Sequence, residues 1–515
     1  MKLEGNAITS FEASAKQAQP QPTAVPENQG YRATAVRGAI ATAGGTLAKA
    51  FLQVLSIVVL ARLLTPDDFG VTAMVFPILS FASIFQQAGL GMAVLQRDSV
   101  TDEELSAIFW TNVSLGVLVG ALLAAMSPLV ADFYNEPRVQ ALTAAAGVLM
   151  IIGSLTSQHM ILMMRKMLFG RLALIDVLSL TVGTTLAIAT AYFFQSYWAI
   201  FLLSFGTTAS MCIFAWVLGG WRPVRPAPLR QVKDVLLFGG NITLSNLATY
   251  FGQNLDKILI GRWIGAVALG YYERAYKVVL LPVLFVHMPL FRLLVPMLSK
   301  SKHEAERHRR LFVLGYQLAL FLTVPGILLL VIAAPKFVVF VLGEQWLSAA
   351  PIFSWLALAS LAQLVIGPLN MIFVSQGRSR EAMLSSVASS LYLSIAFMIG
   401  LRWGATGVAA AFAISELVRA PVMLWYATRR GPVSLRDTLK VLAPFVLSTA
   451  ICALIYLEVP AVSEAHGSAL TFIVVAGAAA YVITFLSMFV NETSRRFLHE
   501  AVSIVRGFVR TKSFS

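Results

Sequence analysis

Ten ionisable side chains interrupt the long apolar stretches of this 515-residue sequence, and they are its clearest candidates for chemistry. An ionised group inside a membrane is costly, so such residues either neutralise one another or line a polar site. The ten are Lys49, Asp176, Asp256, Lys257, Glu273, Arg274, Lys277, Arg292, Glu416 and Arg419. Their spacing separates the residues that pairing can explain from those that need another explanation.

Two pairs fall at helical spacing. Glu273 and Lys277 are four residues apart, and Glu416 and Arg419 are three apart. Each pair can therefore meet on one face of a helix. Three residues lie near the end of a predicted span and can extend to the membrane surface: Asp176, Arg292 and Arg419.

Lys49, Lys257 and Arg274 are harder to explain by pairing. A water-filled cavity lined by these cations would attract a phosphorylated ligand, because a guanidinium binds phosphate as a fork and an ammonium binds it as a point charge. The alternative is structural pairing, for example with Asp256. Asp256 and Lys257 are adjacent, however, and adjacent side chains point to different faces of a helix.

Other kinds of chemistry have little support in the sequence. It contains no Walker-type phosphate loop, no GxSxG or HExxH motif and no Cys/His cluster. We therefore expect no catalytic residue, no metal site and no cofactor. Since there is no ATP site, any active transport must be secondary or coupled to the membrane potential.

The elements that position these residues are predicted to be membrane-spanning helices. The chain is 58% hydrophobic and 12% charged, whereas soluble domains average roughly 45–50% and 25%. About 20 apolar residues span a bilayer. The sequence offers fourteen such stretches: 38–61, 69–90, 106–131, 139–161, 172–194, 197–219, 236–261, 270–296, 311–333, 350–373, 382–401, 404–426, 441–458 and 468–490. The expected fold class is an all-α polytopic membrane protein with fourteen transmembrane helices.

The distribution of basic residues predicts the orientation. Of the 39 Lys and Arg residues, 28 fall in the two tails and one set of loops, 5 in the opposite loops and 6 in the spans. Cytoplasmic loops are rich in Lys and Arg, so both termini are predicted to be cytoplasmic. The net charge of +14 is then mostly a topology signal and does not indicate nucleic-acid binding.

An internal repeat relates the two halves of the chain. The segment ARLLTPDDFG has a counterpart 200 residues later in GRWIGAVALG, which pairs Arg62 with Arg262 and Gly70 with Gly270. Polar residues form matching stripes on one helix face: Thr46, Lys49, Gln53 and Ser56, then Asn246, Thr249, Gln253 and Asp256. The repeat predicts two six-helix halves with a site between them. The alternative is that these polar side chains only hold the bundle together.

This organisation divides the chain into parts that differ in composition. They are a disordered cytoplasmic N-terminal tail (1–37), an N-lobe of six spans (38–219), a C-lobe of six spans (236–426), two further spans (441–490) and a cytoplasmic tail (491–515). The second tail contains an amphipathic segment, 495–511, which is predicted to lie on the anionic cytoplasmic leaflet.

Several short motifs resemble those of a known family. ARLLTPDDFG with QQAGLGMAVLQR, then GYYERAYK and VLGEQW, are similar to stretches of the polysaccharide transporter family. The chain most resembles the Wzx-type, colanic-acid-exporter-like flippases of the MOP exporter superfamily. The resemblance implies a V-shaped fold of two pseudo-symmetric six-helix lobes plus two C-terminal helices, with a cationic central cavity.

The resemblance also implies a function. Members of this family translocate undecaprenyl-diphosphate-linked oligosaccharides to the periplasmic leaflet of the bacterial inner membrane, in exopolysaccharide and lipopolysaccharide biosynthesis. The implied partners are the lipid-linked oligosaccharide, membrane lipids, and a polysaccharide polymerase with its co-polymerase. The candidate cavity residues are Lys49, Gln53, Asn246, Thr249, Gln253, Asp256, Lys257, Arg274 and Lys277. Lys49, Lys257 and Arg274 would hold the diphosphate, and the uncharged side chains Gln53, Gln253, Asn246 and Thr249 would hydrogen-bond to sugars.

Two other functions stay open. A MATE-like multidrug or cation antiporter of the same superfamily would have a carboxylate-lined cavity, whereas cations are in excess here. A polytopic polysaccharide polymerase or ligase would place catalytic residues in a long periplasmic loop. The non-cytoplasmic loops are all short, the longest being 332–349 and 459–467. Drug-resistance profiling would test the first alternative, and an assay for glycosidic bond formation the second.

Overall fold

The computed structural model describes residues 29–87, 94, 100–225, 250–458, 469–498 and 500. Nearly all of these residues are helical, and none of them lies in a β-strand. Twelve helical segments within these ranges are long and apolar enough to cross a membrane. The chain is therefore an all-α, multi-pass membrane protein, as its composition predicts.

The helices of the first half are long and joined by short connections. They are α2 (Gln29–Leu63), α3 (Pro66–Gln87), α5 (Asp102–Tyr134), α6 (Arg138–Arg165), α7 (Phe169–Phe194) and α8 (Trp198–Gly219).

The second half begins with a helix over 250–263 and includes several short elements. It continues with α10 (Ala266–Lys300), α11 (Ala305–Ile332), α12 (Ala334–Leu342), η2 (Glu344–Ala349), α13 (Ala350–Ile366), α14 (Leu369–Ser375), α15 (Ser379–Gly400), η3 (Leu401–Trp403) and α16 (Gly404–Thr428). It ends with α17 (Leu435–Glu458), α19 (Ala469–Ser487) and η4 (Met488–Val490).

Several boundaries differ from the predicted spans. Helix α2 begins at Gln29 rather than at residue 38, so residues 29–37 of the tail that was predicted to be disordered are helical. The predicted span 350–373 is divided into α13 and α14 at Pro368, which has no N–H to continue the ladder. The count of fourteen spans stays a prediction, because 236–249 lies outside the described residues. The same holds for the N-terminal tail up to residue 28 and for most of the amphipathic segment 495–511.

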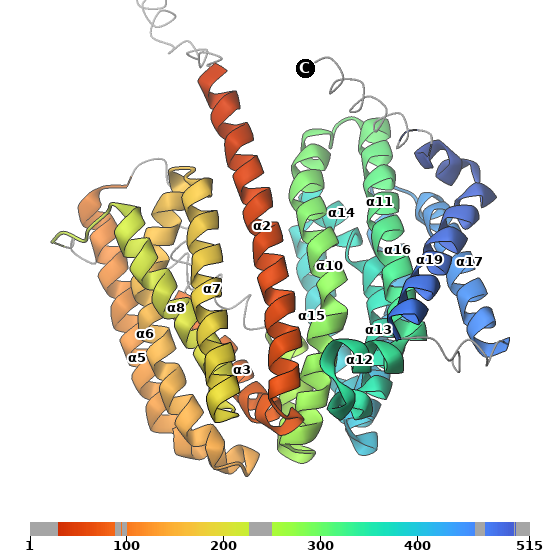
Figure 1. Cartoon of the computed structure of the whole chain (residues 1–515). Helices are drawn as coiled ribbons and strands as arrows, with labels where there is room; N and C mark the ends of the chain where they lie inside the picture. Colours follow the sequence, from red (N-terminus) through yellow and green to blue (C-terminus); the bar gives the residue numbers. More distant parts are fainter. Residues whose placement is uncertain are drawn as a thin grey trace, which may run out of the picture.

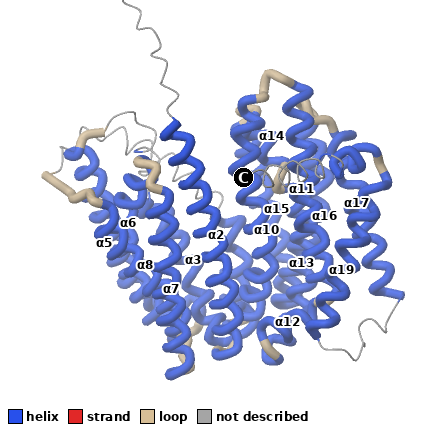
Figure 2. The backbone as a smooth tube through the Cα atoms, turned by 45° about the horizontal axis from the view of Figure 1, so that its top comes forward, coloured by secondary structure: helices blue, strands red, loops and turns tan. Residues whose placement is uncertain are grey.

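The helices form two lobes with α2 between them. Figures 1 and 2 show α5, α6, α7 and α8 on one side and α10 to α16 on the other, with α17 and α19 at the outer side of the second group. We call α2 to α8 the N-lobe, since α2 packs on α7, and the helix 250–263 with α10 to α16 the C-lobe. The lobes diverge towards the end from which α2 starts, and they approach each other where α3 and α10 begin (Figure 1).

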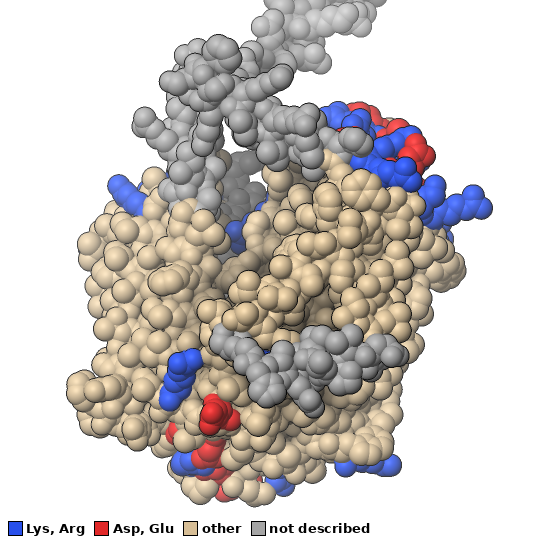
Figure 3. All heavy atoms as spheres, turned by 45° about the vertical axis from the view of Figure 1, so that its right-hand side comes forward, with Lys and Arg blue, Asp and Glu red and all other residues tan. Residues whose placement is uncertain are grey.

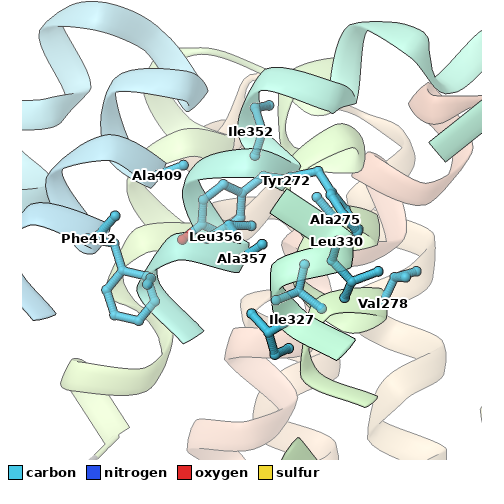
Figure 4. Packing of buried hydrophobic residues seen from close by; sticks show 14 of the residues in the cluster. Tyr272, Ala275, Val278, Ile327, Leu330, Ile352, Leu356, Ala357, Ala409 and Phe412 are labelled. Atoms are coloured by element: carbon cyan, nitrogen blue, oxygen red, sulfur yellow. The ribbon is translucent and has the colours of Figure 1, made fainter. Parts of the chain in front are cut away.

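A continuous apolar core fixes α10 within the C-lobe. Tyr272 and Val278 of α10, Ile327 of α11, Leu356 of α13 and Phe412 of α16 are all buried and belong to one cluster (Figure 4). Close packing is the main force between helices in lipid, because lipid chains are as apolar as the side chains. The charged side chains of α10 therefore project from a rigid support.

Candidate functional site

The two lobes meet where α3 and α10 begin, at positions that the internal repeat relates. Helix α3 begins at Pro66, and α10 begins 200 residues later at Ala266. A methyl group added to Gly70 would overlap the backbone of Ala266, and one added to Gly270 would overlap the backbone of Pro66. The contact, which we call the seam, is therefore reciprocal, as expected for two lobes related by a two-fold axis. Only glycine permits this approach.

Two cations of α10 extend across the seam onto aromatic rings of α3. The guanidinium carbon of Arg274 lies 3.6 Å from the ring centre of Phe69, and Nζ of Lys277 lies 4.8 Å from that of Phe76. Both distances are within the range of a cation–π interaction. Arg274 is only 5% exposed, whereas the Lys277 side chain is 38% exposed. Arg274 is thus enclosed in the lobe contact, and Lys277 remains accessible at its edge.

A short segment of the C-lobe, which we call the strap (340–346), binds the end of α2 beside the seam. Nε1 of Trp346 and Nε2 of Gln345 donate hydrogen bonds to the carbonyl oxygen of Ala61, at 2.8 and 2.7 Å. Arg62 donates a hydrogen bond in the opposite direction, to a strap carbonyl at 2.7 Å. The strap donors satisfy a carbonyl in the last turn of α2, where the helix supplies no partner.

Three of the four motifs that carry the family resemblance therefore converge at the seam, and the fourth, QQAGLGMAVLQR, lies largely outside the described residues. The Trp346 ring lies 5.4 Å from the Phe69 ring and 5.9 Å from the Tyr271 ring, between centres. These three aromatic residues come from VLGEQW, ARLLTPDDFG and GYYERAYK respectively. Sequence reasoning identified the motifs but did not indicate that they contact one another.

Lys49 of α2 has a partner on another helix. Its Nζ lies 3.0 Å from Oδ2 of Asp176 on α7, and the two side chains are 41% and 34% exposed. The spacing of the sequence could not reveal this pair, because 127 residues separate its members. The sequence predicts only that Asp176 lies near the end of a span. The structure shows in addition that its ion pair with Lys49 joins α2 to α7 of the N-lobe.

The two pairs predicted from helical spacing are confirmed. Nζ of Lys277 lies 3.0 Å from Oε1 of Glu273, and Nη2 of Arg419 lies 2.6 Å from Oε2 of Glu416. Arg419 also donates a hydrogen bond to Ser389 of α15 at 2.8 Å. The second pair therefore joins α15 to α16.

Asp256 and Lys257 meet, contrary to the prediction that they point to different faces. Their side chains are 3.7 Å apart, and Nζ of Lys257 also donates to the carbonyl oxygen of Gln253 at 2.9 Å. Asp256 accepts a hydrogen bond from the hydroxyl of Tyr272 at 2.8 Å. The prediction was wrong because the long lysine stem curls around the helix. This pair is nearly buried, and Nζ lies 4.8 Å from the ring centre of Tyr276.

The uncharged candidates fall into two groups. Gln53 on α2 and Gln253 on the helix 250–263 are exposed, whereas Asn246 and Thr249 lie outside the described residues. Figure 3 shows a hollow between the lobes, with Lys or Arg atoms in it. Arg274 is inaccessible in this conformation because Phe69 and the seam cover it, and Asp256 is buried to the same extent.

Sequence reasoning missed the aromatic side of the seam. Phe69 and Phe76 are seven residues apart, so they lie on one face of α3, opposite the two cations of α10. That spacing was a readable signal. In an apolar helix it is hidden, however, because phenylalanine is also the ordinary residue facing lipid.

Comparison with known proteins agrees with the fold and the motifs. Residues 59–351 match the family described as "Polysaccharide biosynthesis protein". The chain is 26% identical over 418 residues to the teichuronic acid biosynthesis protein TuaB of Bacillus subtilis (strain 168), covering 80% of this chain and 86% of TuaB. It is 25% identical over 390 residues to the lipopolysaccharide biosynthesis protein WzxC of Escherichia coli (strain K12), covering 75% of this chain and 79% of WzxC.

A solved structure has the same fold. The lipid II flippase MurJ, in an inward closed conformation, superimposes with a TM-score of 0.70 and 14% identity, covering 86% of this chain and 98% of MurJ. The two-lobed arrangement that the sequence predicts is therefore a known membrane-protein fold.

Proposed function

Because the chain belongs to the polysaccharide biosynthesis protein family, we propose that it is a flippase for undecaprenyl-diphosphate-linked oligosaccharide repeat units. It would move them across the bacterial inner membrane by alternating access, for exopolysaccharide or lipopolysaccharide biosynthesis. The names of its relatives refer to teichuronic acid and lipopolysaccharide biosynthesis, which supports a glycan precursor as the substrate class. In this proposal the chain is a transporter and not an enzyme.

The observation that carries the proposal is the seam, which joins two lobes that diverge away from it (Figure 1). The lobes touch backbone to backbone at Gly70 and Gly270, contacts with the C-lobe continue along α3 to Pro77 and Phe81, and Figure 3 shows a hollow between the lobes. Two rigid lobes that meet towards one end can rock against each other, which opens a site between them to one membrane face at a time.

We assign the diphosphate of the substrate first to Lys277, the accessible cation at the edge of the seam. A charge-assisted hydrogen bond of this kind contributes about 1.5–3 kcal/mol. Lys49 adds positive charge from the N-lobe, and Arg274 becomes available only when the seam opens. The prenyl chain stays in the surrounding lipid throughout.

The sugars would be held by the polar stripes of the two pseudo-equivalent helices. Gln53 and Gln253 are exposed and carry both donors and acceptors, which suits hydroxyl groups. Asn246 and Thr249 belong to the same stripe in the sequence. The Asp256–Lys257 pair would shape the wall of the cavity without carrying net charge.

The distribution of Lys and Arg supports an orientation for this cycle. With both termini in the cytoplasm, the seam faces the periplasm and the hollow faces the cytoplasm. The substrate would then enter from the cytoplasmic leaflet, and a polysaccharide polymerase with its co-polymerase would receive it on the other side.

A deletion strain tests this function. We expect it to lose surface polysaccharide and to accumulate lipid-linked repeat units, and a plasmid carrying the wild-type chain should restore export. A deletion strain that exports and polymerises its glycan normally would contradict the proposal.

A further inference from the structure

Lys277 is held by one carboxylate and one ring, and it has capacity for another partner. Its ammonium group has three N–H donors. Among the described residues, Nζ meets Oε1 of Glu273 at 3.0 Å and faces the ring of Phe76. The side chain is 38% exposed, so an anion that enters between the lobes can reach it.

Glu273 is more deeply buried than its partner and is incompletely satisfied. Its side chain is 8% exposed, and Oε2 has no hydrogen-bond partner among the described residues. A buried carboxylate is normally stabilised by several donors. Glu273 therefore binds Lys277 through a single contact, and another anion can replace that contact.

The surroundings of Glu273 leave Lys277 as its main partner. Its own helix adds Arg274, which is turned onto Phe69, and the helix 250–263 adds Lys257, which is already paired with Asp256. Neither α13 nor α14, which both pack on α10, contains an ionisable residue. Lys257 and Arg274 add positive charge near the carboxylate, but among the described residues Lys277 is the one of the three that forms an ion pair with Glu273.

We propose that Glu273 competes with the diphosphate of the substrate for Lys277, and so acts as a releasing group for the bound substrate. The inference rests on the function proposed above. When the diphosphate enters, it displaces Glu273 from the ammonium group because it carries more charge. When the lobes rock and the substrate loses its other contacts, Glu273 recovers Lys277 and the diphosphate leaves.

Binding to purified protein in lipid nanodiscs tests this competition, with farnesyl diphosphate as the probe and farnesol as the probe without phosphate. Removing the competing charge in Glu273→Gln should tighten farnesyl diphosphate binding about tenfold. Lys277→Met should abolish the preference for the diphosphate. The matched control is Glu304→Gln, which removes a carboxylate paired with Arg307 at the far end of α10 from the seam. It should bind like the wild type.

The same variants separate release from binding in cells. Glu273→Gln should export several-fold less glycan although it binds the probe more tightly, because release becomes slow. A merely structural role for Glu273 would instead weaken both binding and export. The shorter Glu273→Asp keeps the charge but reaches Lys277 less well, so its affinity should lie between those of the wild type and Glu273→Gln.

Two results would overturn the inference, and they differ from failure of the proposed function. Competition is excluded if Glu273→Gln binds farnesyl diphosphate no more tightly than the wild type does. If Glu273→Gln does not fold, competition is excluded when Glu273→Asp binds farnesyl diphosphate with the same affinity as the wild type. If the wild type binds farnesyl diphosphate no better than farnesol, the diphosphate site itself is wrong, and the proposed function fails with it.

Discussion

The N-lobe and the C-lobe share their backbone plan but differ in chemistry. Both place a helix end, a short interruption and a glycine at the seam, 200 residues apart. Of the ten ionisable residues in predicted spans, however, only Lys49 and Asp176 belong to the N-lobe. Where the C-lobe has Glu273 and Lys277, the N-lobe has Ala73 and Pro77.

This difference indicates that the two lobes contribute different groups to the seam. The N-lobe contributes aromatic rings to the seam, and the C-lobe contributes the cations that lie on them. Repetition preserved the geometry that lets the lobes approach, while the charge that recognises a phosphorylated ligand is concentrated on one side. Each prediction below changes either the shared geometry or the unequal chemistry.

The largest effect is expected from the shared geometry. Gly270→Ala places a methyl group against the backbone of Pro66, and we expect it to abolish export and to destabilise the protein by about 1–3 kcal/mol, measured by thermal unfolding in detergent. Gly70→Ala should behave alike, since the contact is reciprocal. The control is Gly44→Ala, which meets no neighbouring atom and should be neutral or stabilising. Normal export by either seam variant would show that the lobes do not need this approach.

The next effect is expected from the charge of the C-lobe. Lys277→Met removes the accessible cation, and export should fall by about 10–100-fold at unchanged protein level, because one charge-assisted contact to the substrate is lost. Export is measured as surface polysaccharide in the complemented deletion strain. Lys302→Met changes an exposed lysine in a loop and should export normally. Equal losses in both variants would mean that the position of the charge is unimportant.

A smaller effect is expected from the strap. Trp346→Phe keeps an aromatic ring against Phe69 but removes the hydrogen bond to Ala61, which contributes about 1 kcal/mol. The population of molecules with an open seam should rise about fivefold. It is measured as the distance between spin labels at Thr65 and Val267, by double electron–electron resonance on a protein whose two native cysteines have been replaced. Trp403→Phe, at a tryptophan that is 69% exposed, should leave the distances unchanged. A strap that does not act on the seam would give the same distances in both variants.

The smallest effect is expected in the N-lobe. Asp176→Asn breaks a partly exposed ion pair, which stabilises a protein by about 0–1 kcal/mol. Export should therefore stay within about twofold of the wild type. A loss of export as large as that of Lys277→Met would show that charged residues of both lobes are equally important, and it would contradict the concentration of functional charge in the C-lobe.

Much of the fold could be predicted from the sequence, because its determinants are local. Apolar length gives the spans, and the 200-residue repeat gives the twin lobes with a site between them. The pairs Glu273–Lys277 and Glu416–Arg419 were also predictable, since helical spacing fixes which side chains can meet.

The remaining contacts depend on which helices become neighbours. The Lys49–Asp176 pair, the strap on Ala61 and the stacking of Arg274 on Phe69 all join residues that are far apart in the chain. The sequence predicts Arg274 as a cavity cation, and spacing alone could not show that a phenylalanine of the other lobe covers it. Polar stripes and charges indicate that a site exists, but the packing of α3 on α10 decides which cations a ligand can reach.

The most direct test of the central claim is a sidedness assay in proteoliposomes that contain a lipid-linked oligosaccharide in both leaflets. The fraction of oligosaccharide open to an external glycosidase is followed over time. With the wild-type chain, we predict that the accessible fraction rises from about half to nearly all of the lipid, while Gly270→Ala stays at the level of empty liposomes. A wild-type protein that leaves the accessible fraction at that same level would contradict the account.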